Sequence, residues 1–162
     1  MDLEDAIPTT KAVWTEEDFD QMGWHDDFVH AMAYQRDGAG QGELLLDLDY
    51  AVKWVPPLPG ERYFSQWVCP ATLVFHGVEQ LDGSSEPNYH PAWGTVLLDI
   101  FRGEPDERAM RSWTMDGLCF TITFVADAFT QYLRHLPVLT QGNKLTLEER
   151  SGLSFDRRSF EV

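Results

Sequence analysis

Apolar residues recur at every second position through much of the chain, which is the spacing of a half-buried β-strand rather than of a helix. From Phe28 to Tyr34 the even-numbered residues (Phe, His, Met, Tyr) form one face of an expected strand, and the odd-numbered residues (Val, Ala, Ala) form the other. Residues 43–54 repeat the pattern, with leucines at positions 44, 46 and 48. The glycine-rich sequence RDGAGQG separates the two stretches, so we expect an antiparallel hairpin.

Further stretches of the same kind follow along the chain. They cover residues 62–68, 71–81, 95–101, 111–115 and 118–125. The last two flank Asp116-Gly117, a dipeptide that two-residue hairpin turns favour. Most connections are too short for the crossover that a parallel pair needs. We therefore predict a mainly β fold, an antiparallel two-layer sandwich or half-open barrel of seven to eight strands.

Short helices are expected at both ends of this fold. Residues 1–23 read as an acidic leader, with Thr15 and Asp18 at the start of a short N-terminal helix that ends by Gly23. A second short helix is expected after Thr146. The length of 162 residues fits one domain, and we place a single β-rich domain over residues 24–162.

Acidic residues outnumber basic residues by 27 to 12, which gives a formal net charge of -15. Residues 1–27 alone hold nine carboxylates and one lysine. Because nucleic-acid binding depends on Lys and Arg displacing counterions from phosphates, this composition argues against a nucleic-acid partner. The same charge would speed encounter with a basic protein. The alternative is that the acidity serves solubility alone, and the composition leaves both open.

Other compositional features point to a cytoplasmic protein without a cofactor. No apolar run approaches the roughly 20 residues that span a bilayer, so no membrane partner is expected, and the N-terminal residues lack the pattern of a secretion signal. Cys69 and Cys119 lie 50 positions apart. Neither belongs to a CxxC motif or lies near a histidine at the spacing of metal ligands. We expect them to be buried reduced thiols and assign no metal site.

Candidate ligand-binding side chains cluster near the first two strands: His25, Asp26, His30, Asp47 and Asp49. The apolar pattern places Phe28, Met32 and Tyr34 on the face of the second-strand leucines. That register puts His30 on the core side, facing Leu48 or a near neighbour. Asp47 and Asp49 then lie on the opposite face with Val29 and Ala31, so His30 and the two aspartates are not expected to converge unless the strand carries a bulge.

Asp47 and Asp49 are two positions apart on one strand, which places their side chains roughly 7 Å apart on one face. Such a pair can supply a general acid and a general base, because like charges separate the two pKa values. The alternative is a solvated strand face. The cluster of His25, Asp26 and Asp27 before the strand could bind a cation weakly through oxygen ligands, or could simply cap or turn the chain there. No GxSxG, HExxH or phosphate-binding glycine loop is present, so no catalytic residue is assigned.

Three segments resemble a family of small uncharacterised bacterial proteins. They are Trp24-His25-Asp26, the Asp-Tyr-x-x-Lys-Trp segment at 49–54, and the Pro-x-Thr-Leu-Val-Phe segment at 70–75. The resemblance spans most of residues 24–140. It implies a bacterial, cytoplasmic, single-domain protein and carries no functional residues.

Three functional hypotheses follow. The first is a non-enzymatic interaction protein, for example an acidic immunity-type protein that neutralises a basic toxin or nuclease. The second is a small-molecule-binding protein or enzyme with a His/Asp pocket. The third is a structural or oligomeric role through an exposed strand edge. The sequence leaves the partner and the oligomeric state open.

Overall fold

The computed structural model describes residues 7–85 and 95–161 of the protein, so the first six residues of the expected leader lie outside it. The fold is mainly β, as predicted. Its elements are β1 (Val13–Thr15), the 3-10 helix η1 (Glu16–Gln21), β2 (Phe28–Arg36), β3 (Gly42–Val55), β4 (Ser65–His76), β5 (Glu79–Ser85), β6 (Leu97–Pro105), β7 (Arg111–Gly117), β8 (Phe120–Ala126), β9 (Ala128–Leu133) and β10 (Val138–Thr140). No helix in the described ranges is long and apolar enough to cross a membrane.

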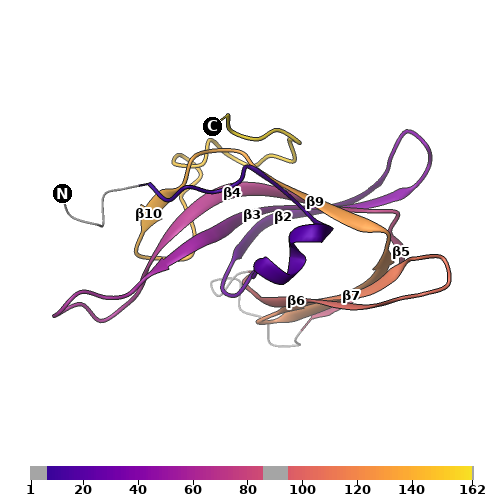
Figure 1. Ribbon diagram of the computed structural model, residues 1–162, viewed down its shortest axis with the longest axis horizontal. Helices are drawn as coiled ribbons and strands as arrows, with labels where there is room; N and C mark the ends of the chain where they lie inside the picture. The colour runs from indigo at the N-terminus through magenta and orange to yellow at the C-terminus, as the bar shows by residue number, and fades with distance from the viewer. Residues whose placement is uncertain (1–6, 86–94, 162) are drawn as a thin grey trace.

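The strands form two antiparallel sheets. The larger has six strands in the order β1-β9-β4-β3-β2, with β10 pairing β4. The smaller has four strands in the order β5-β8-β7-β6. Figure 1 shows the two sheets as layers, with the C-terminal segment lying over the larger sheet on the side away from β6 and β7. The larger sheet therefore has a covered outer face.

The two sheets are joined at two places. The β4–β9 pair continues into the β5–β8 pair through sharp bends at Gly77 and Asp127. Gly77 has a φ of 65°, and a Cβ there would lie 3.3 Å from the Cβ of Asp127, so a side chain would crowd the bend. At the opposite side, an isolated bridge between Phe28 and Val96 links β2 to the chain entering β6. These links hold the inner faces of the sheets together.

The hydrophobic core lies between the sheets. The leucines at 44, 46 and 48 of β3 face inward, as the alternation predicted, and pack with β4 and β7 residues such as Phe75 and Trp113. Phe19 carries η1 onto this core, with its ring centroid 5.7 Å from that of Trp113. The segment from β1 to η1, which the sequence assigned to a leader, thus contributes to the same core.

Several predicted details differ from the structure. The described residues form more strands than the seven or eight expected, because β1, β9 and β10 lie outside the stretches that the alternation marked. β4 runs unbroken through Pro70 and so joins two stretches that were expected to be separate strands. Neither predicted terminal helix forms as an α-helix. Residues 16–21 form the 3-10 helix η1, and residues 147–151 form a turn. The Asp116-Gly117 dipeptide lies within β7, and the hairpin turn falls two residues later.

Candidate functional site

A β-bulge in β2 decides where the candidate histidine lies. Val29 pairs with Leu48 and Ala31 pairs with Asp47, which leaves His30 as the extra residue between them. Val29 therefore takes the core position, and His30 turns to the outer face of the larger sheet. There the imidazole Nε2 lies 2.7 Å from Asp49 Oδ2. The prediction that His30 faces Leu48 and stays apart from the aspartates is wrong, because the bulge shifts the register by one residue.

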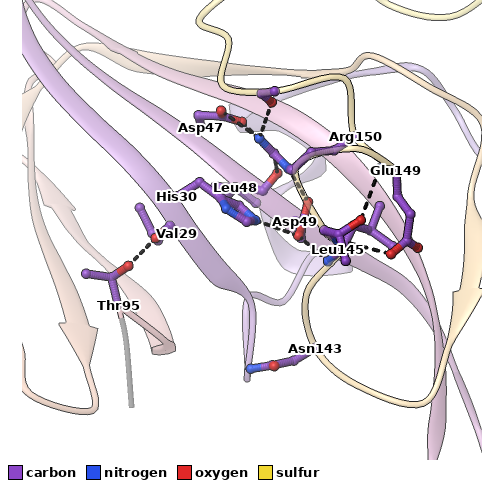
Figure 2. A network of polar contacts seen from close by, with 12 residues as sticks. Val29, His30, Asp47, Leu48, Asp49, Thr95, Asn143, Leu145, Glu149 and Arg150 are labelled. Carbon is purple, nitrogen blue, oxygen red and sulfur yellow. Dashed lines mark hydrogen bonds and ion pairs between the residues drawn. The ribbon is translucent and has the colours of Figure 1, made fainter. Parts of the chain in front are cut away.

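Asp47 and Asp49 share the outer face of β3, as predicted, but this face is not solvated. The C-terminal segment covers it, and both side chains are fully buried. Arg150 lies between the two carboxylates, as Figure 2 shows. Its NH2 group is 2.7 Å from Asp47 Oδ1, and its Nε is 3.2 Å from Asp49 Oδ1. Arg134 adds a second cation, 2.7 Å from Asp47 Oδ1.

These contacts use the carboxylate oxygens that acid–base chemistry would need. Asp47 Oδ2 accepts bonds from Arg150 at 2.8 Å and from the Ser154 N–H at 2.8 Å. Asp49 Oδ2 accepts the Leu145 N–H at 2.7 Å in addition to His30. Burial alone would raise the pKa of Asp47, but the bonds from Arg150, Arg134 and Ser154 hold the pKa below its usual value. The network therefore fastens the C-terminal segment to the sheet by ionised groups.

His25 and Asp26 do not join this network. The His25 side chain is 68% exposed, and its Nδ1 lies 3.1 Å from the Leu98 carbonyl oxygen. Asp26 is partly exposed, with a φ of 64°, and its carboxylate is 3.7 Å from His25 Nε2. Of the five predicted residues, the structure thus brings together His30, Asp47 and Asp49 and leaves this exposed pair aside.

The neighbouring Asp27, which the sequence grouped with His25 and Asp26, is a buried carboxyl. Its Oδ1 accepts the Ala51 N–H at 3.0 Å, while its Oδ2 has no hydrogen-bond partner among the described residues. Burial raises the pKa of Asp27 well above its usual value, and the nearby Asp49 adds to the shift. Asp27 therefore favours its neutral form and ties the chain just before β2 to Ala51 of β3.

Sequence reasoning missed the arginines that complete the network. Arg134 and Arg150 lie 87 and 103 residues from Asp47, so no local pattern connects them. One signal was present: the run Leu44-Leu45-Leu46 is apolar on both faces, which is typical of a strand covered on both sides. Among the described residues, no group of three or more His, Cys, Asp or Glu side chains is arranged to hold a metal ion.

The outer face of the smaller sheet contrasts with this covered face. Trp113, Met115 and Phe124 point into the core, so their neighbours along β7 and β8 face outward. The outward side chains form two rows of cross-strand neighbours that run across the sheet from β5 through β8 and β7 to β6. One row is Asp82, Thr123, Thr114 and Phe101, and the other is Ser84, Thr121, Asp116 and Asp99. No described segment covers these rows in Figure 1.

The charges of this sheet are unbalanced. Residues 79–85 and 97–126 hold seven carboxylates and three arginines. Each arginine already contacts an acid: Arg102 lies 3.5 Å from Asp20, Arg108 lies 3.1 Å from Glu79, and Arg111 lies 2.9 Å from Glu16. In the described part of the chain, the outward-facing Asp82, Asp99 and Asp116 have no ion pair. The outer face of the smaller sheet, with its two outward rows, is called the acidic face below.

No protein-family model, curated protein or solved structure matches this chain.

Proposed function

We propose that the protein is a non-enzymatic interaction protein whose acidic face binds a basic protein. The form that best suits this charge is an immunity-type protein, which would cover the basic surface that a toxin or nuclease presents to nucleic acid. A bacterial cytoplasmic setting is part of the proposal and rests on the resemblance of the three sequence segments.

One observation carries the proposal. Asp99 of β6 and Asp116 of β7 are direct cross-strand partners on the acidic face. Like charges directly opposite each other destabilise a sheet. Among the described residues, Asp99 Oδ1 accepts the adjacent Ile100 N–H and Asp116 Oδ1 accepts the Thr121 hydroxyl, so neither contact supplies a positive charge. A Lys or Arg side chain from a partner would relieve this repulsion.

Apolar side chains stand beside the carboxylates. Phe101 is 54% exposed, Leu118 is 50% exposed and Leu98 is 36% exposed. Protein interfaces commonly combine an apolar or aromatic centre with a charged rim. Phe101 shares its outward row with Asp82 and threonines, so it would be the central contact of a partner bound there.

The enzyme hypothesis finds less support. The most specific version of this hypothesis used Asp47 and Asp49 as a general acid and a general base. In the structure, oxygens of both carboxylates accept hydrogen bonds from Arg150 or from a backbone N–H. A proton on either carboxylate would break a buried ion pair. The His/Asp hypothesis therefore narrows to ligand binding beside His30.

Affinity capture from a lysate of the native host, washed over a salt series, tests the proposed function. We expect a basic protein to be retained at about 0.15 M salt and released near 1 M, because the Debye length falls from about 8 Å to about 3 Å. If no protein is retained, or if the retained proteins are acidic or indifferent to salt, the proposal fails.

A further inference from the structure

We propose that the groove between β2 and the C-terminal segment binds a small amphipathic carboxylate, one with a short alkyl or aryl chain. The groove has a volume of about 460 Å³, and small-molecule sites usually measure about 300–1,000 Å³. It is lined by Phe28, His30, Lys144, Leu145, Thr146, Leu147 and Leu153. This inference does not depend on the acidic face and can hold or fail separately.

His30 supplies a fixed polar group at the groove. Its side chain is only 9% exposed, and the bond from Nε2 to Asp49 holds the ring in one orientation. Asp49 in turn lies 3.2 Å from Arg150 Nε, which holds the carboxylate that orients the ring. Nδ1 has no hydrogen-bond partner among the described residues, and His30 lines the groove. With protons on both ring nitrogens, Nδ1 would donate a hydrogen bond to a carboxylate.

Lys144 supplies the positive charge. Its ammonium lies 4.9 Å from the centroid of the Phe28 ring, a cation–π contact that holds it beside His30. Lys144 has no ion pair in the described part of the chain. Glu149, an acid of the adjoining turn, accepts the Thr146 N–H at 3.2 Å. Lys144 is therefore a local exception on a chain of net charge -15, and it favours an anion.

The remainder of the groove is largely apolar and could take the alkyl or aryl part of the ligand. Leu147 is 56% exposed and Leu153 is 57% exposed, although both border the groove. Exposed leucines beside an aromatic ring favour an apolar ligand body, because covering them removes apolar surface from water. The polar and apolar parts of the groove together match an amphipathic carboxylate. The carboxylate group of the ligand would lie at Lys144 and His30, and its alkyl or aryl part would lie along Phe28 and the two leucines.

Titration of the ¹⁵N-labelled protein with octanoate, followed by amide chemical shifts, tests the inference. Octanol and octylammonium serve as neutral and positively charged probes of the same length. We expect saturable shifts at residues 28–30 and 144–147 with octanoate, and binding about ten-fold weaker for the other two probes, as loss of a charge-assisted bond requires. Lys144→Gln should weaken octanoate binding about ten-fold. The matched control Lys53→Gln, an exposed lysine outside the groove, should leave it unchanged.

His30→Gln provides a second variant, because glutamine can still donate to Asp49 but lacks Nδ1. It should weaken octanoate binding with the fold retained in the amide spectrum. The inference is overturned if octanoate gives no saturable shifts at the groove, if octylammonium binds equally well, or if Lys144→Gln behaves like Lys53→Gln. None of these outcomes bears on the acidic face.

Discussion

Replacing Arg150 with alanine would leave the buried carboxylates of Asp47 and Asp49 without the cation they share. The Arg150 side chain is fully buried and contacts both aspartates through Nε and both NH groups. It also donates to the Gly152 carbonyl at 2.8 Å, which holds the turn of the C-terminal segment. The substitution therefore removes a charge and an anchor together.

The expected loss of stability follows from the charges that remain. Asp47 keeps Arg134, and Asp49 keeps His30 and the Leu145 N–H, so one negative charge stays buried without compensation. Removing one member of a buried ion pair costs about 3–5 kcal/mol. The free energy of unfolding of a folded domain is about 5–15 kcal/mol, so the variant should lose a large fraction of its stability.

Urea denaturation at pH 7 measures this effect, with Arg158→Ala as the matched control. Arg158 is 68% exposed and lies 3.5 Å from Asp156, and such surface pairs contribute about 0–1 kcal/mol. Arg150→Ala should lower the free energy of unfolding by about 3 kcal/mol or more, and the control by less than about 1 kcal/mol. Equal losses for the two variants would refute the assignment of the network as a structural anchor.

Three other predictions concern buried and paired acids and a thiol. Burial raises the pKa of Asp27, so above about pH 4 the unfolded chain loses a proton that the folded chain keeps. In urea titrations, the stability of the wild type relative to Asp27→Asn should therefore fall as the pH rises from about 4, and a constant difference would contradict this. Asp99→Asn and Asp116→Asn should each raise the free energy of unfolding by about 0.2–1 kcal/mol at low salt, and a decrease would argue against like-charge repulsion. Burial raises the pKa of Cys69 to about 12, so in a Cys119→Ala background its reaction with a disulfide reagent at pH 8 should follow unfolding; rapid labelling of the folded protein would contradict its burial.

The strands could be predicted because burial of one face leaves a period of two in the sequence. The inward leucines of β3 illustrate this. The bulge at His30 could not be predicted in the same way. Phe28 and Val29 are both apolar, so either can take the core position, and the alternation does not show which. Because of that ambiguity, the sequence placed His30 in the core, whereas the structure places it beside Asp49 on the outer face.

At the C-terminal turn a local helix-start signal is present, but the predicted short helix does not form. Thr146 and Glu149 form the reciprocal capping bonds of a helix start, at 3.2 and 3.1 Å. The segment nevertheless ends after one turn, because Ser151 and Gly152 adopt φ values of 61° and 86°. Tertiary bonds from Arg150 and Ser154 to Asp47 then hold the chain against the sheet. Contacts between residues so far apart in sequence leave no periodic trace.

The most direct test of the central claim compares affinity capture by the double variant Asp99→Asn/Asp116→Asn with capture by a charge-matched control. Glu148→Gln/Glu161→Gln removes two exposed carboxylates from the C-terminal segment and leaves the acidic face intact. Quantitative mass spectrometry at about physiological salt should show a basic protein retained by the wild type and the control and largely lost by the double variant. Equal retention of that protein by both variants would contradict the assignment of the acidic face as the binding surface.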